Sequence, residues 1–243
     1  MHKKWVKISI ICAILGYLVF SIFAFSFRSK NQVCKAVLVE ISDSSSLRFI
    51  TKRNVVSLLD RSGINPVGGT MKDIRTDQIE MVLEKQPRIK QAECYKTPDG
   101  KIKVVVKQRE PILRIMNNGH GYYVDSEGKT MPISSDFTAY VPVASGAISE
   151  KFAKNELYDF ALFLKRNKFW DAQIEQIYVD YNEEVELVPR VGDHIIALGK
   201  LDSYEYKLEK LMSVYKDGFS RTGWNKYRRV DLRYENQVVC TKR

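Results

Sequence analysis

The longest apolar run of the chain lies close to its N-terminus. Residues 8–27, ISIICAILGYLVFSIFAFSF, contain no charged side chain. At about 1.5 Å per residue, a helix of this length spans about 30 Å, the thickness of the hydrocarbon core of a bilayer. The pattern predicts a single transmembrane helix after a short tail of residues 1–7. A cleaved signal peptide is the alternative, but its shorter apolar region would end in small residues, whereas this one ends in Phe23, Phe25 and Phe27.

The charges on the two sides of this segment do not fix its orientation. Three basic residues precede it and three follow within a similar distance: Lys3, Lys4 and Lys7, and then Arg28, Lys30 and Lys35. A short basic tail ahead of a large domain usually stays in the cytoplasm. We therefore expect the residues after the span to lie on the extracytoplasmic side.

A first folded unit is expected over residues 35–109, after a linker of residues 28–34. Apolar residues alternate along KAVLVEI, which indicates a strand. The spacing of apolar residues then predicts two helices, one from its N-cap Thr51 to Gly63 and one over residues 76–85. A hairpin follows, with TPDG as the turn between IKQAECYK and KIKVVVKQ. This β-α-α-β-β order predicts a compact α+β unit with both helices on one face of a three-stranded sheet.

Short strands and frequent turns dominate residues 110–243. Turn signals such as NNGHG and DSEG separate the strands, which predicts a meander of antiparallel strands. Two helices are expected here, one that begins near Glu150 and stops before Trp170. The other begins at Asp202 or Ser203, has the most regular apolar spacing in the chain, and ends at Gly218. The second unit is therefore predicted as a strand-rich domain with two helices.

The chain closes with a strand pattern over residues 230–239. Apolar and polar side chains alternate along VDLRYE, as in a strand with one buried face. Few residues follow, so this strand is a candidate for the edge of a sheet, where one row of N–H and C=O groups lacks an internal partner. An extended segment of another protein can add a strand to such an edge.

The net charge of +10 invites a nucleic-acid interpretation, but its distribution argues against one. The first 30 residues carry five Lys and Arg and no acid, so half of the net charge flanks the apolar segment. A basic and aromatic stretch near the C-terminus comprises Arg221, Trp224, Lys226, Tyr227, Arg228, Arg229, Arg233 and Tyr234. This composition suits a protein partner, or core aromatics below a hydrated surface. Nucleic acid is expected least, because an exported domain rarely meets it.

No catalytic, metal or cofactor site is indicated by the residue pattern. His2 precedes the apolar segment, and neither His120 nor His194 stands in a catalytic motif. We expect His120 in an exposed loop and His194 at the start of a strand. Three carboxylates are expected to be solvated in a turn: Glu183, Glu184 and Glu186. An enzyme is therefore not predicted.

The four cysteines add no site. They lack the CxxC spacing of metal and redox motifs. Cys94 and Cys240 fall in strand patterns and are expected as small buried residues, with a disulfide as the alternative.

Several stretches resemble the FtsQ/DivIB family of bacterial cell-division proteins. ITKRNVVSLL is similar to the first helix of the family's POTRA domain, and KQPRIKQAECYKTPDGKIKVVVKQREPILRI to its last two strands and the passage beyond them. YYVDSEGKTMPI, VPVASG and VDLRYENQ are similar to stretches of its β domain. The resemblance implies an inward N-terminus, with an exported POTRA domain and β domain. It also implies a scaffold in the cytoplasmic membrane at the division septum, without catalytic residues or cofactors.

The resemblance also implies where partners bind. In the family the β domain binds the small coiled-coil proteins FtsB and FtsL through its last strand and the helix before it, and the complex helps control septal peptidoglycan synthesis. Other division proteins are implied for the POTRA domain. Tyr234 stands where the family has the Tyr of its LRY motif. The implied contact residues are Lys207, Lys210, Val230, Leu232, Arg233, Tyr234, Glu235, Asn236, Gln237, Val238 and Val239.

Parts of that contact differ from the family's pattern. Where some relatives carry a Gly after the Tyr and a Trp further on, this chain has Gln237 and Lys242. Either Lys207 or Lys210 corresponds to the family's basic helix contact. Two other functions are left open by the sequence: a POTRA-containing component of envelope assembly or secretion, and a membrane-tethered envelope enzyme that uses His120 or His194.

Overall fold

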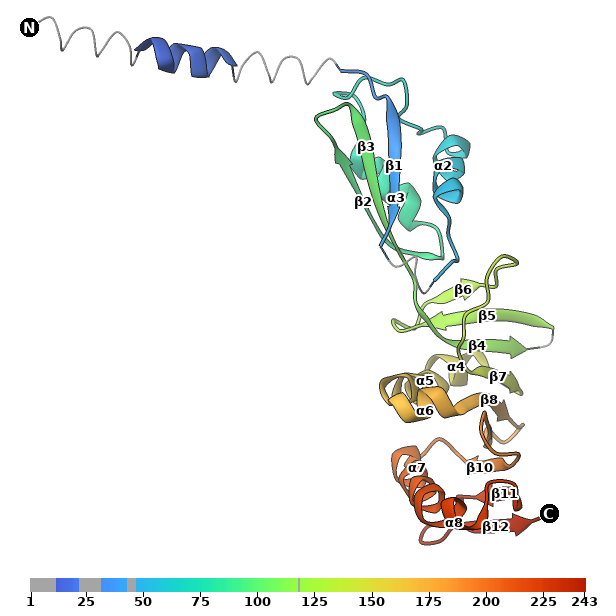
Figure 1. Ribbon diagram of the computed structural model, residues 1–243. Coiled ribbons are helices and arrows are strands. Elements are labelled where there is room, and N and C mark those ends of the chain that lie inside the picture. Colours follow the sequence, from blue (N-terminus) through green and yellow to red (C-terminus); the bar gives the residue numbers. More distant parts are fainter. Residues whose placement is uncertain (1–11, 22–31, 43–46, 118) are drawn as a thin grey trace, which may run out of the picture. The chain divides into compact units, whose positions relative to one another are not determined.

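The computed structural model describes residues 12–21, 32–42, 47–117 and 119–243 (Figure 1). The chain divides between Gln108 and Arg109 into two compact units.

The N-terminal apolar segment is described only in part. Residues 12–21 are helical. The two ends of the predicted span of residues 8–27, and the tail of residues 1–7, lie outside the described residues. In the part of the chain that the structure describes, no helix has the length and apolar character needed to cross a membrane.

The first unit is a three-stranded sheet with two helices, in the chain order that the sequence predicts. Its elements are β1 Ala36–Ile41, α2 Lys52–Arg61, α3 Thr76–Glu84, β2 Ile89–Lys96 and β3 Lys101–Gln108. The strand order is β1-β3-β2, in which the central β3 runs parallel to β1 and antiparallel to β2. The expected β-α-α-β-β unit is confirmed.

Helix α2 begins and ends for local reasons. The Thr51 side chain accepts from the Asn54 backbone N–H at 3.2 Å, and the Asn54 side chain accepts from the Thr51 N–H at 2.9 Å. This capping box satisfies two of the N–H groups that a helix N-terminus leaves without partners. Gly63 follows the helix with a φ of 66°, a conformation that glycine adopts without steric cost. Both predicted ends of this helix are therefore confirmed.

The two helices cover one face of the three-stranded sheet. Val55 and Leu59 of α2 are buried in one cluster with Val104 of β3. On the other face, Leu38 of β1 and Tyr95 of β2 are about half exposed. This face is therefore open in the first unit.

The second unit is built on one mixed sheet of nine described strands. Its strands are β4 Pro111–Asn117, β5 His120–Asp125, β6 Thr130–Pro132, β7 Val143–Gly146, β8 Ile174–Val179, β9 Val185–Pro189, β10 Ile195–Gly199, β11 Tyr227–Asp231 and β12 Val239–Lys242. Their order in the sheet is β12-β11-β10-β9-β8-β7-β4-β5-β6. The expected antiparallel meander is wrong in part, because β4 and β7, β7 and β8, and β10 and β11 pair in parallel. Parallel neighbours need crossover connections, which helices supply before β8 and before β11.

More helices cover this sheet than the two that the sequence predicts. They are α4 Glu150–Lys154, α5 Glu156–Arg166, α6 Lys168–Gln173, α7 Tyr204–Ser213, the π-helix η1 Val214–Phe219 and α8 Ser220–Thr222. Figure 1 shows them along one side of the strands. Phe160 of α5 and Leu208 of α7 share a buried core with Ile177 of β8 and Val230 of β11.

The single helix expected from Glu150 is two helices, α4 and α5, and α5 ends at Arg166, before Trp170 as predicted; the further helix α6 was not expected. The Asn167 side chain accepts from the backbone N–H groups of Phe169 and Trp170 at 3.1 and 3.3 Å, so it caps a further helix, α6. Trp170 lies in that helix with 3% of its surface exposed. The apolar spacing alone did not show this restart of the helix.

The last helix also runs past its predicted end. Gly218 lies within η1, where the helix widens to π geometry, and the helical stretch continues to Thr222. Gly223 ends it with a φ of 89°. π-helical turns are rare, and they often occur at functional sites.

The closing strand predicted over residues 230–239 is two strands and a turn. β11 ends at Asp231, and β12 begins at Val239. The Asp231 carboxylate accepts from the backbone N–H of Arg233 at 3.1 Å. An aspartate that bonds to the backbone two residues on favours a turn, so the alternation along VDLRYE does not continue as a strand.

Candidate partner-binding site

β12 forms one of the two edges of the nine-stranded sheet. It pairs antiparallel with β11, with Val230 opposite Cys240 and Asp231 opposite Val239. Among the described strands no other strand pairs with β12. Its outer N–H and C=O groups are therefore available to an added strand.

An exposed turn leads into this edge. Leu232 is fully buried, and the chain then emerges at Arg233. Tyr234 is 48% exposed, and Glu235, Asn236 and Gln237 are also exposed. We call residues 233–237 the recognition turn. An exposed aromatic side chain therefore lies in the turn that leads into the edge strand.

Lys210 of α7 holds the recognition turn in place through hydrogen bonds to its backbone. Its Nζ donates to the backbone oxygens of Tyr234 and Glu235 at 2.6 and 2.9 Å. The same Nζ lies 5.1 Å from the centre of the Tyr206 ring. Partial burial, together with the nearby Lys207, lowers the pKa of Lys210. One ammonium group thus joins the helix, an aromatic ring and the recognition turn.

Lys207 lies one helical turn earlier and makes different contacts. Its Nζ donates to the backbone oxygen of Lys200 at 2.9 Å and pairs with Asp202. These groups precede α7, so Lys207 fixes the start of that helix. The two lysines that the sequence could not tell apart therefore have separate roles within the chain.

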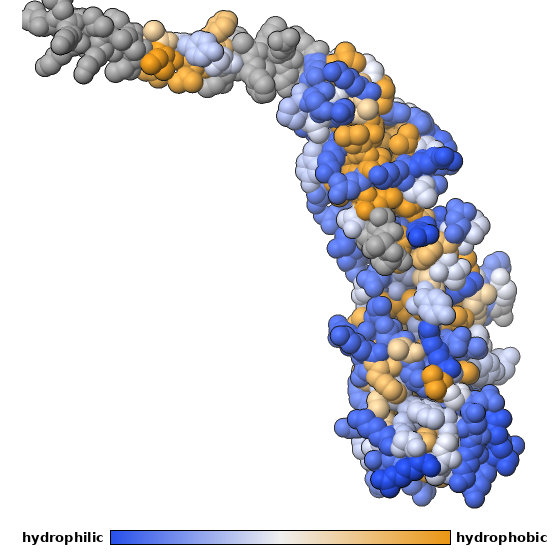
Figure 2. Space-filling model, viewed as in Figure 1, coloured by the Kyte–Doolittle hydropathy of each residue, from blue (hydrophilic) through white to orange (hydrophobic). Residues whose placement is uncertain are grey.

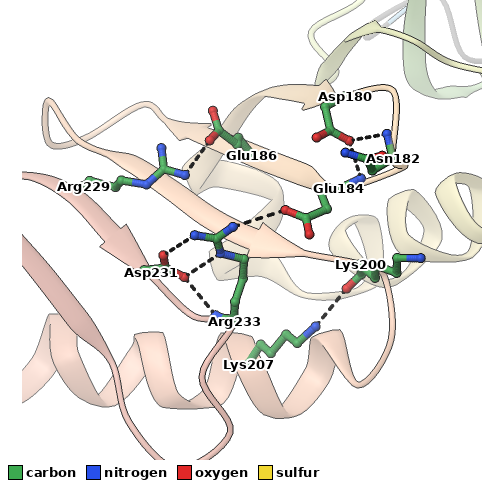
Figure 3. A network of polar contacts seen from close by, with 9 residues as sticks. All are labelled: Asp180, Asn182, Glu184, Glu186, Lys200, Lys207, Arg229, Asp231 and Arg233. Carbon is green, nitrogen blue, oxygen red and sulfur yellow. Dashed lines mark hydrogen bonds and ion pairs between the residues drawn. The ribbon is translucent and has the colours of Figure 1, made fainter.

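A network of charged side chains lies beside β11 (Figure 3). Arg233 binds both oxygens of Asp231, at 3.0 and 2.7 Å, and also contacts Glu184 at 3.2 Å. Arg229 pairs with Glu186 of β9 at 2.6 Å. The hydrogen bonds that Arg233 donates to Asp231 lower the pKa of the Asp231 carboxyl and raise the pKa of the Arg233 guanidinium. Arg233 is therefore directed across the end of the strand, where it holds the turn at the exit of β11.

The surface over β11, β12 and α8 is largely hydrophilic on the face that Figure 2 shows. The exposed apolar residues here are single side chains, Tyr234 and Val239. An apolar patch is thus not the main feature of this region. Main-chain pairing along β12, with a few side-chain anchors, is what the arrangement offers a partner.

Comparison with known protein families identifies the family of this chain. A family model described as FtsQ/DivIB, C-terminal related, matches residues 110–241, and one described as a POTRA-like domain matches residues 32–107. The chain belongs to the FtsQ/DivIB family. Comparison with the curated proteins gives no significant match.

The two matches assign each folded unit to a known type of domain. The first is a POTRA-like domain, and the second is the C-terminal domain of an FtsQ/DivIB protein. This is a division-related family of scaffold proteins rather than of enzymes. Within the described residues no group of His, Cys, Asp and Glu is arranged to hold a metal ion.

Apart from Lys207 and Lys210 on α7, the contact residues that the FtsQ/DivIB resemblance implies fall into three groups in the structure. Arg233 to Gln237 form the exposed recognition turn, and Val238 and Val239 lead into the edge strand. Val230 and Leu232 are 0% exposed and belong to the core of the unit. Those two positions support the site from inside and do not present a side chain to a partner.

The basic and aromatic stretch near the C-terminus of this FtsQ/DivIB chain also contains both core residues and surface residues. Trp224 and Tyr227 pack against the core, whereas Arg229 and Arg233 lie in ion pairs. The Glu residues expected to be solvated are partly engaged, since Glu184 and Glu186 are the partners of these arginines. His120 begins β5 and is exposed there.

His194 is a structural residue that the sequence did not identify. It is 3% exposed, and its Nε2 lies 2.9 Å from the Tyr215 hydroxyl. The rings of Phe219 and Tyr215 pack against it edge-on. Burial lowers the pKa of His194 and raises that of Tyr215. Tyr215 lies on η1.

The cysteines form no disulfide among the described residues. Cys34 and Cys94 are buried thiols, and Cys240 is partly buried. Burial raises the pKa of the Cys94 thiol to about 12. Such a thiol stays protonated and is a poor nucleophile or metal ligand.

Proposed function

We propose that this chain is a non-enzymatic, membrane-anchored scaffold of the bacterial division complex. It recruits small coiled-coil partners of the FtsB and FtsL type and helps to control septal peptidoglycan synthesis. Family membership and the apolar segment of residues 8–27 support this proposal. The N-terminus is in the cytoplasm, and both folded units are on the extracytoplasmic side of the inner membrane at the septum.

One observation carries the proposed recruitment. Among the strands that the structure describes, β12 is paired on one side only, so its other side can take an extended partner segment as a tenth strand. Backbone hydrogen bonds would supply affinity and register. The Tyr234 side chain beside the edge would supply selectivity, because aromatic residues are frequent anchors of interfaces.

The recognition turn supports this mode of binding because it is held before a partner arrives. Lys210 fixes two of its backbone oxygens, and Arg233 is fixed by Asp231 and Glu184. A preformed surface loses less conformational entropy on binding than a mobile one. In this proposal Lys207 and Lys210 act within the chain. The contacts to the partner come from Arg233 to Val239.

The test is recovery of an FtsB-type protein from the same bacterium by the full chain and by a chain that ends at Val238. The shortened chain should lose recovery, while circular dichroism confirms that its core remains folded. Cys240 packs on the core, so its removal also perturbs the sheet at this edge. A matched variant, Thr130→Pro in the edge strand β6 at the other end of the sheet, shows the effect on recovery of perturbing an edge that does not bind the partner. Equal recovery by the shortened chain and the full chain would rule out binding through β12.

A role in envelope assembly or secretion is the other function that POTRA-like domains allow. Depletion in the native bacterium separates the two. Long undivided filaments are expected for the division scaffold, whereas envelope defects without filaments would favour assembly or secretion.

A further inference from the structure

One end of the POTRA-like unit is built from three segments around the point where the described chain enters it. The Cys34 N–H donates to the Gly69 oxygen at 2.8 Å, and the Gly68 N–H donates to the Cys34 oxygen at 2.9 Å. The Lys35 N–H donates to the Gly100 oxygen at 2.8 Å. Residues 32–35, the loop of residues 66–72 and the turn of residues 97–100 are thus fixed together. We call this the entry end.

The entry end exposes a pair of apolar side chains. Val33 and Val67 are each 50% exposed, although most valines of the unit are buried or half-buried. Val33 forms an isolated bridge with Thr70, which keeps it beside the loop that carries Val67. Lys35 and Lys72 are exposed on the same segments. Apolar tips among lysines are the composition of a surface that meets lipid headgroups.

Charge is distributed unequally between the two units. Residues 31–108 carry 14 Lys and Arg against nine Asp and Glu, whereas residues 109–243 carry 20 of each. The net positive charge of the folded part therefore belongs to the POTRA-like unit. An anionic surface would attract this unit and leave the C-terminal unit free.

The connection to the predicted span is short. Four residues, 28–31, separate Phe27 from the first residue of the entry end. Even fully extended, such a connection reaches only about 17 Å. Since the headgroup region adds several ångströms to each side of the hydrocarbon core, the connection lets the entry end reach this layer and keeps it close to it if residues 8–27 span the membrane.

We propose that the entry end rests on anionic phospholipid headgroups, with Val33 and Val67 against the acyl boundary and Lys35 and Lys72 beside phosphate groups. The inference rests on the proposed membrane anchor. Its consequence is that the POTRA-like unit is held at the membrane surface and does not turn freely on its connection.

The experiment uses the full chain in vesicles of phosphatidylcholine with or without phosphatidylglycerol. Cys12 and Cys240 are replaced by Ser, while the buried Cys34 and Cys94 are kept, and a fluorophore is attached to Val67→Cys. A matched chain carries the fluorophore at Lys107→Cys, an exposed position near the opposite end of β3. Quenching by lipids with a nitroxide on the headgroup is then measured.

We expect strong quenching at position 67 and little at position 107. Replacing Lys35 and Lys72 by Gln should weaken docking to phosphatidylglycerol vesicles about fivefold for each lysine. Equal quenching at the two positions, in chains that resist alkaline extraction, would overturn the docking and leave the anchor intact. Quenching that is independent of phosphatidylglycerol would overturn the role of the lysines. Extraction of the chain by alkali would overturn the anchor and the docking together.

Discussion

The two edges of the nine-stranded sheet differ in how well they are protected. β6 is three residues long, ends in Pro132, and buries Met131. A short strand and a proline are devices that keep other chains from pairing with an edge. β12 has no proline, exposes Val239, and follows an exposed turn that two long-range contacts hold in place. The comparison shows that β6 is protected as an edge, whereas β12 lacks such a proline, which supports the proposal that a partner adds a strand there.

Proline substitutions in the two edge strands should differ most strongly in their effect on partner affinity. The N–H groups of successive residues in a strand point to opposite sides, so either Thr241 or Lys242 has its N–H facing away from β11. The proline variant at that position, Thr241→Pro or Lys242→Pro, removes this outward N–H group. That variant should weaken binding of an FtsB-type partner about a hundredfold. Thr130→Pro in β6 should leave it unchanged. Titration of the purified partner measures the affinity, and thermal unfolding identifies a variant that loses the β11 pairing instead.

Removing the exposed aromatic side chain of the recognition turn should have the next largest effect. Tyr234→Ala should weaken partner binding about 30-fold, which corresponds to about 2 kcal/mol for an interface anchor. Tyr178→Ala on β8 is the matched control, because the two side chains are 48% and 47% exposed. Equal effects of the two changes on affinity would contradict a specific role for Tyr234.

The two lysines of α7 should differ if Lys210 supports the recognition turn. Lys210→Met removes the donors to Tyr234 and Glu235, so amide exchange in residues 233–237 should become faster and affinity should fall about fivefold. Lys207→Met removes only contacts before α7, so neither change is expected. Weaker binding by Lys210→Met without faster exchange would instead indicate direct contact between Lys210 and the partner.

The smallest expected effect is a pH dependence of stability that originates at His194. Burial lowers its pKa in the folded chain, so below its ordinary value of about 6.5 the unfolded chain binds more protons. Its contribution to stability is therefore complete above that value and is lost as the pH falls toward the folded pKa. The melting temperature should decrease from about pH 7.5 to about pH 5.5. His194→Gln should reduce this decrease, and His120→Gln, at an exposed position, should not.

Sequence patterns predicted the POTRA-like unit well because its structure depends on neighbouring residues. Thr51 and Asn54 cap α2 across three positions, and the TPDG turn joins β2 to β3. The C-terminal unit was predicted less accurately because its details depend on distant residues. The oxygens of the recognition turn are bound by a lysine 24 residues earlier, and Glu186 pairs with an arginine 43 residues later. Period-two alternation in VDLRYE could not show that Asp231 would end the strand through its own side chain.

The candidate site was located from sequence through its family resemblance more than through its pattern. That resemblance proposed a part of the chain for partner binding, but it could not separate buried from exposed positions. Val230 and Leu232 share the alternation of Tyr234, yet they are in the core. The edge itself lies later than expected, at Val239–Lys242.

Hydrogen exchange with and without an FtsB-type partner tests the central claim most directly. The amides of Val239 to Arg243 that face away from β11 should become protected when the partner binds, while those of Thr130 and Met131 in β6 should exchange at an unchanged rate. Binding that leaves exchange in β12 unchanged would contradict strand addition at this edge.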